Sequence, residues 1–68
     1  MLPFTVFADA QGRIVTLKIG ELHRDEATFI LARLTDVGAG RLSLSAAREQ
    51  IDDRLRRLAV SRAARGND

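Results

Sequence analysis

The chain opens with two short apolar runs separated by a turn signal. Residues 2–8 and 13–19 have the length and the apolar content of β-strands. Between them, Asp9 and Gly12 occupy the first and fourth positions of a turn, which favours a type I turn followed by a left-handed glycine. This pattern predicts an antiparallel β-hairpin that ends at Gly20.

Strict alternation along each run predicts which side chains share a face of the hairpin. One face of the first strand takes Leu2, Phe4, Val6 and Ala8, and the other takes Pro3, Thr5 and Phe7. Both sets are mostly apolar, so we expect this strand to be covered on both sides. In the second strand Val15, Leu17 and Ile19 share a face, and Lys18 lies on the outward face, where its charge protects an edge.

Two helices are predicted after the hairpin, over residues 24–36 and 44–64. The first has a buried stripe at spacings of three and four residues, formed by Ala27, Ile30, Leu31 and Leu34. The second begins at an N-cap, Ser43 or Ser45, and has a narrow apolar seam of Leu44, Ala47, Ile51, Leu55 and Leu58. That seam either packs on its own hairpin and first helix or binds a partner chain. We expect residues 62–68 to fray.

These elements predict an α+β fold of order ββαα in one small domain, residues 1–68. The hairpin and first helix take residues 2–36, and a C-terminal helical extension takes residues 41–65. A core of this size contributes only about 3–5 kcal/mol and usually needs further stabilisation. The chain has no cysteine and one histidine, which excludes disulfides and a structural zinc site. We therefore expect no metal or other cofactor, and a homo-oligomer, most simply a dimer.

The charge pattern disfavours nucleic acid as a partner. Eleven basic residues are interleaved with nine acidic ones, and the net charge is only +2. Two arginines of the second helix have an acid four residues before them, Asp52 before Arg56 and Asp53 before Arg57, and the helix has no aromatic residue for base stacking. The sequence has no apolar run of about 18 residues and no signal-peptide pattern, so we expect no membrane association and a cytoplasmic location.

Polar residues at the start of the first helix are the remaining candidates for a site. His23 could be a metal ligand or a general base, but no second ligand or nucleophile accompanies it. Asp25 and Glu26 are adjacent carboxylates, and adjacent helix residues point in different directions. We expect His23 either to cap the helix or to be solvated, and we expect the two acids to complement the helix dipole.

The opening segment resembles the TlpA/ResA-like thiol-disulfide oxidoreductases. The resemblance rests on the pattern Pro-x-Thr-x-Phe-x-Asp-x-x-Gly-x-Ile and covers residues 2–36; the matching residues are Pro3, Thr5, Phe7, Asp9, Gly12 and Ile14. It implies the C-terminal half of a thioredoxin fold, with Pro3 as the cis-proline at the substrate-binding edge. It also implies a periplasmic parent protein that carries out thiol-disulfide exchange.

The chain departs from that family because it has no Cys-x-x-Cys motif and no preceding βαβ portion. Dithiol exchange requires a thiolate nucleophile, so we expect no redox catalysis from this chain alone. Two hypotheses follow. The chain is the silent C-terminal half of a TlpA-like parent, whose missing N-terminal half is its partner, or it is a small self-associating interaction module.

Overall fold

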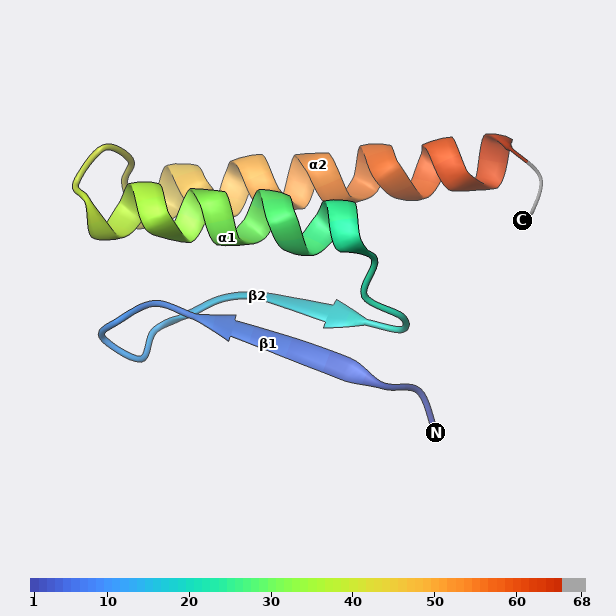
Figure 1. Ribbon diagram of the computed structural model, residues 1–68, viewed down its shortest axis with the longest axis horizontal. Coiled ribbons are helices and arrows are strands. Elements are labelled where there is room, and N and C mark those ends of the chain that lie inside the picture. The colour runs from blue at the N-terminus through green and yellow to red at the C-terminus, as the bar shows by residue number, and fades with distance from the viewer. Residues whose placement is uncertain (66–68) are drawn as a thin grey trace.

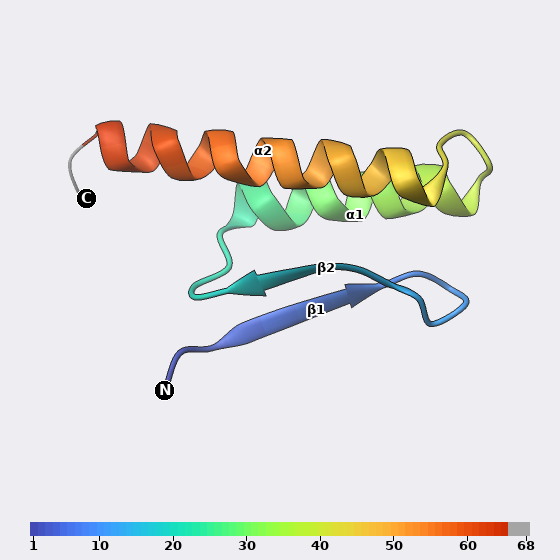
Figure 2. The same cartoon turned by 180° about the vertical axis from the view of Figure 1, so that it is seen from behind.

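A computed structural model of the chain describes residues 1–65. The order of elements is β1 (Phe4–Ala8), β2 (Ile14–Ile19), α1 (Arg24–Gly38) and α2 (Leu44–Ala64). The strands form an antiparallel two-stranded sheet, and the two helices run antiparallel to one another along one of its faces (Figure 1). Figure 2 shows the same two layers from behind, with the opposite face of the hairpin turned away from both helices. The predicted α+β fold of order ββαα is confirmed.

The turn between the strands forms as its residues predict. The Asp9 carboxylate accepts hydrogen bonds from the backbone N–H groups of Gln11 and Arg13, at 3.0 and 2.8 Å. Gly12 has a φ of +81°, a conformation in which a side chain is strained. Its N–H donates to the Asp9 carbonyl at 3.0 Å and closes the turn.

A β-bulge interrupts the pairing just after this turn. Phe7 pairs with Thr16, but the next pair is Ala8 with Ile14, which leaves Val15 as an extra residue in β2. Val15 is buried against the helices. Because the period of a strand is two residues, one inserted residue moves the side chains beyond it to the opposite faces.

The bulge overturns two expectations about the hairpin. Leu17 and Ile19 do not share the buried face of Val15 but are exposed on the opposite side of the sheet. Lys18 does not protect an outward edge, because its side chain turns towards α1 and is only 20% exposed. The expectation that β1 is covered on both sides is also wrong, since Phe4 and Val6 are exposed.

We call the side of the sheet that points away from the helices the outer face. Its residues are all apolar: Phe4, Val6, Ala8, Ile14, Leu17 and Ile19. The inner face packs on the helices and adds Phe7 and Val15 to the core. Only one layer of the expected two therefore covers the hairpin.

Helix α1 extends two residues beyond its predicted end. Ile30 is fully buried, but Leu31, the next member of the predicted stripe, is 54% exposed. The helix is followed by Gly40 with a φ of +77°, which lets Arg41 N–H donate to the Asp36 carbonyl at 2.9 Å. The turn reverses the chain and lays α2 against α1.

Helix α2 begins at Ser43, one of the two predicted N-caps, whose hydroxyl accepts from the Ala46 N–H at 3.0 Å. The seam of this helix faces inward, with Ala47 and Ile51 buried. The seam therefore packs on the hairpin and first helix of its own chain, which is the first of the two alternatives. The predicted fraying from residue 62 is not seen up to Ala64, and residues 66–68 lie outside the described part of the chain.

Replacing Ser43 with alanine should lower the free energy of unfolding by about 1 kcal/mol, because the substitution leaves the Ala46 N–H without its acceptor. Urea unfolding followed by circular dichroism measures the change. Ser45→Ala is the matched control, since Ser45 is exposed and lies inside the helix. Equal losses from the two variants would contradict the assignment of Ser43 as the cap.

The core is small and lies between the hairpin and both helices. Its buried centre consists of Val15, Ile30 and Ile51. Partly buried hydrophobic residues surround it, namely Phe7, Phe29, Leu34, Leu44 and Leu55. Within residues 1–65, no helix is long and apolar enough to cross a membrane.

Candidate functional site

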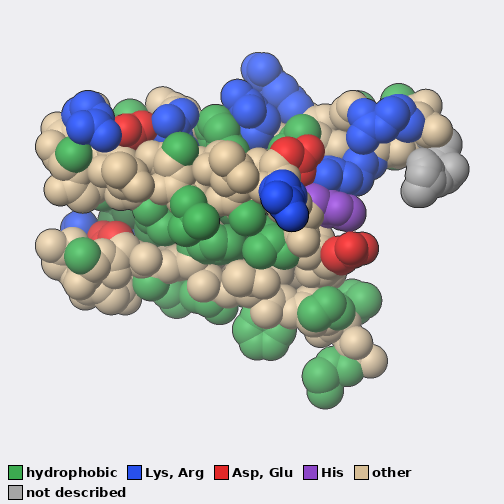
Figure 3. All heavy atoms as spheres, viewed as in Figure 1, with side chains coloured by type: hydrophobic (Ala, Val, Ile, Leu, Met, Phe, Trp, Pro, Cys, Tyr) green, Lys and Arg blue, Asp and Glu red, His purple; other side chains and the backbone are tan. Residues whose placement is uncertain are grey.

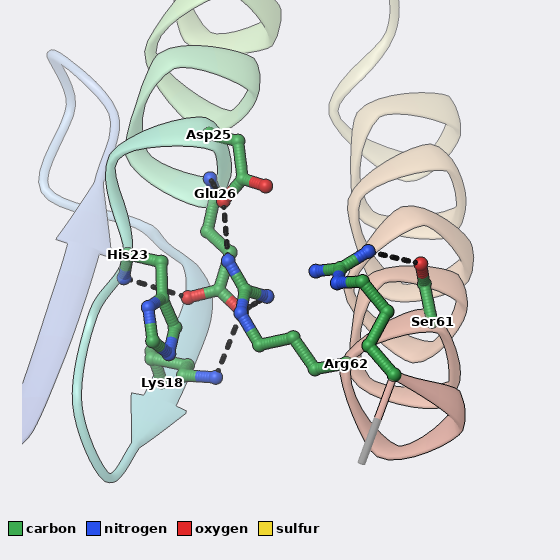
Figure 4. Close-up of polar contacts among 7 residues, drawn as sticks. Lys18, His23, Asp25, Glu26, Ser61 and Arg62 are labelled. Atoms are coloured by element: carbon green, nitrogen blue, oxygen red, sulfur yellow. Dashed lines mark hydrogen bonds and ion pairs between the residues drawn. The ribbon is translucent and has the colours of Figure 1, made fainter. Parts of the chain in front are cut away.

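A buried ion cluster joins β2 to the start of α1 and the end of α2 (Figure 4). Its centre is Glu26, whose residue exposure is only 1%. One carboxylate oxygen of Glu26 accepts from the His23 N–H at 2.9 Å, and the other accepts from Lys18 Nζ at 3.0 Å. Arg62 contributes from α2, with Nη2 2.8 Å from Asp25 and Nη1 3.6 Å from Glu26. The cluster thus ties the end of α2 to the adjacent β2 and α1, with Arg62 37 residues from Asp25 in the chain.

The cluster keeps both acids ionised. Burial alone would raise the pKa of Glu26, but the hydrogen bond from the His23 N–H and the Lys18 ammonium outweigh burial and hold the pKa below its ordinary value. The hydrogen bond and charge of Arg62 lower the pKa of Asp25, against a smaller opposing effect of desolvation. A carboxylate held in this way is a poor proton acceptor at neutral pH.

The geometry gives the ion cluster a structural role. His23 occupies the N-cap position of α1, but its side chain makes no capping hydrogen bond; the Glu26 carboxylate instead accepts from the His23 backbone N–H and so stabilises the first turn. No hydroxyl or thiol nucleophile joins the cluster, and residues 1–65 contain no group of three side chains suited to a metal ion. The candidate residues His23, Asp25 and Glu26 do lie in one cluster, but their contacts connect β2, α1 and α2 and stabilise the fold.

The arginines of α2 are mostly engaged within the chain. Arg56 and Arg57 pair with Asp52 and Asp53, as the spacing predicts. The guanidinium of Arg54 lies over the Phe29 ring, with its central carbon 4.1 Å from the ring centroid. These contacts divide the positive charge of the helix among local partners, which does not favour a continuous phosphate-binding surface.

The outer face of the hairpin is the most unusual surface of the molecule. Phe4 is 66% exposed, Leu17 49% and Ile19 63%, and no charged side chain lies among the six outer-face residues. Hydrophobic side chains line the lower side of the molecule in Figure 3, whereas most visible Lys and Arg side chains lie over the helices. Together the outer-face residues expose on the order of 500 Å², as much as the largest patch on a typical monomer, which is often functional.

The open edge of β1 adjoins this face. Gly20 N–H donates to the Pro3 carbonyl at 2.8 Å, so the backbone groups of Pro3, Thr5 and Phe7 point towards β2. The backbone N–H and C=O groups of Phe4 and Val6 consequently point away from the sheet. β1 has no charged residue and no proline within its bounds to protect this edge.

Pro3, the residue that the family resemblance singles out, lies directly before β1 and is exposed. Its only hydrogen bond among the described backbone contacts is the one its carbonyl accepts from Gly20. No peptide bond between residues 1 and 65 is cis, so Pro3 does not adopt the cis form that the resemblance implies. Pro3 takes no part in the ion cluster.

Sequence reasoning missed Arg62 and the exposure of the outer face. The sequence predicts that Arg62 frays, but its position near the end of α2 brings it opposite the start of the antiparallel α1. The outer face was hidden by the bulge at Val15, for which the sequence carries no clear signal. The apolar content of both strand faces was the signal that a second covering layer is required.

Comparisons of this chain with models of protein families, with curated proteins and with solved structures find no match.

Proposed function

We propose that this chain is a non-catalytic protein-interaction unit whose hairpin binds another polypeptide. The observation that carries the proposal is the outer face, six apolar residues that the chain's own helices leave uncovered. An apolar patch of this size on a small protein favours a protein partner. The chain has no cysteine, and the lowered pKa of Glu26 makes the ion cluster a poor proton acceptor, so neither supplies a group for catalysis.

The edge of β1 supports the same proposal independently. The backbone groups of Phe4 and Val6 point outwards and can pair with a further strand. At the other edge of the sheet, which β2 forms, Arg48 of α2 donates a hydrogen bond to the Ile14 carbonyl at 2.6 Å. This carbonyl is therefore already engaged within the chain. A partner that adds a strand therefore meets the β1 side more readily.

The resemblance to TlpA/ResA-like proteins suggests the partner. In this reading the chain is the C-terminal half of a thioredoxin-like domain, and the N-terminal half supplies the strands beside β1 and the layer over the outer face. Pro3 then lies at the junction, because it directly precedes β1. The complete parent would exchange thiols and disulfides in the periplasm, whereas the chain by itself would remain cytoplasmic and catalytically silent.

The reading frame upstream of Met1 tests this parentage. It should encode a segment with a Cys-x-x-Cys motif, and that segment, produced separately, should bind this chain in a one-to-one complex. Leu17→Lys should abolish the binding, because the substitution places a charge at the centre of the outer face. Leu31→Lys, at a similarly exposed site on α1, should leave binding unchanged. A stop codon directly before Met1, or equal effects of the two variants, would contradict the proposal.

A further inference from the structure

We propose that in the isolated chain the outer face is covered by a second copy, in a two-fold dimer whose hairpins pack face to face. This inference rests on the proposed role of the hairpin as a docking surface and names its occupant. The four helices lie on the outside of such a dimer. The two sheets form its centre, about 10 Å apart as in other packed sheets.

The size of the face fits a weak dimer. Two copies of a patch of about 500 Å² bury about 1,000 Å² together, which is the lower bound for a specific interface. Leu2 lies next to the patch and is 68% exposed, so it extends the contact beyond that bound. An interface of this size is consistent with dissociation in the micromolar range.

The composition of the face favours a second copy as its occupant. All six residues are apolar, so no like charges oppose one another when the face meets its own copy. The middle pair of the face is Val6 with Leu17, and the two-fold axis passes close to it. An axis in the plane of the interface and perpendicular to the strands sets the bulky end, Phe4 and Ile19, against the smaller Ala8 end of the partner.

Pairing of two β1 edges is the competing arrangement, and it leaves the larger surface uncovered. Edge pairing satisfies the outward N–H and C=O groups of Phe4 and Val6, but these groups already bond to water in the monomer. The outer faces of both copies would remain in water, on the same side of a four-stranded sheet. Face-to-face packing removes this apolar surface from water, which is the stronger driving force.

Sedimentation velocity from about 1 µM to a few hundred µM tests the proposal. The wild-type chain should change from monomer to dimer over this range. Leu17→Lys should weaken the dimer at least about 100-fold, because each dimer would bury two unpaired ammonium groups at its centre. Leu31→Lys is the matched control, since Leu31 is 54% exposed on α1, away from the outer face. This variant should dimerise as the wild type does.

A second variant, Ile19→Lys, protects the test against misfolding of the first. Ile19 is 63% exposed at the bulky end of the outer face, and circular dichroism should show both lysine variants to be folded monomers. A dimer that survives both substitutions overturns face-to-face packing in favour of the β1 edge, because Leu17 and Ile19 lie on β2, the strand remote from that edge.

A wild-type chain that stays monomeric throughout the range overturns the second copy as occupant. That outcome leaves the proposed function standing if the upstream segment still binds and Leu17→Lys still prevents it. If Leu17→Lys and Leu31→Lys have the same effect on dimerisation, and also the same effect on binding of the upstream segment, the docking role of the outer face is overturned.

Discussion

Replacing Ile51 with alanine should leave the chain largely unfolded at room temperature. Ile51 is fully buried and packs with Val15 and Ile30 at the point where the hairpin meets both helices. A substitution of this kind costs about 2–5 kcal/mol. A single core of this size provides about 3–5 kcal/mol in total, so little stability remains. Circular dichroism in a urea titration measures the loss.

Leu31→Ala is the control for this prediction. Leu31 belongs to the predicted apolar stripe of α1, as Ile51 belongs to the seam of α2, but it is 54% exposed, so its replacement should change the free energy of unfolding by less than about 1 kcal/mol. If Ile51→Ala and Leu31→Ala unfold at the same urea concentration, the assignment of the core is wrong.

Replacing Glu26 with glutamine should lower the free energy of unfolding by about 3 kcal/mol at neutral pH. The amide keeps the size of the side chain but leaves the Lys18 ammonium and the Arg62 guanidinium without the carboxylate between them. Breaking a buried ion pair from one side costs about 3–5 kcal/mol, and Lys18 at 20% exposure can partly turn to water. Glu21→Gln is the control, because Glu21 is exposed and makes no ion pair among residues 1–65.

The free energies of unfolding of the wild type and of Glu26→Gln should depend differently on pH. The pKa of Glu26 is lowered from its ordinary value of 4.5 because the His23 N–H and the Lys18 ammonium outweigh burial. A lowered folded-state pKa means that ionised Glu26 stabilises the fold fully above pH 4.5, and that this contribution is lost as the pH falls through the lowered value. The gap between wild type and Glu26→Gln should therefore shrink in acid. A gap that is constant from neutral pH to well below 4.5 would show that the charge of Glu26 contributes nothing.

The order of elements could be predicted because each one has a local signal. Asp9 and Gly12 specify the turn through a side-chain acceptor and a positive φ, and Ser43 specifies the start of α2 through its hydroxyl. The spacing of the seam predicted that Ala47 and Ile51 face inward. Signals of this kind depend only on neighbouring residues, so they can be read from one sequence.

The orientation of β2 could not be predicted in the same way. Val15 is inserted by a bulge, and its effect on Leu17 and Ile19 depends on how β1 pairs with β2. Strict alternation is the simplest assumption, and one extra residue is enough to reverse it. The outer face therefore became visible only when the register was known.

The ion cluster was predicted in part. The acids at the start of α1 were expected to stabilise its first turn, and they do so. The contribution of Arg62 requires α2 to run antiparallel to α1 over its full length, and the contribution of Lys18 requires the bulge. Both depend on tertiary packing and have no local signal.

The central claim is that the outer face of the hairpin is the docking surface of this chain. Methyl NMR spectra of the wild-type protein over a dilution series test it most directly. The account predicts that the methyl signals of Val6, Leu17 and Ile19 shift with concentration as a second copy covers them, while those of Leu31 and Val60 on the helices do not. Shifts centred on the helices would contradict the outer face as the docking surface, and hairpin signals that stay constant at every concentration would contradict a second copy as its occupant.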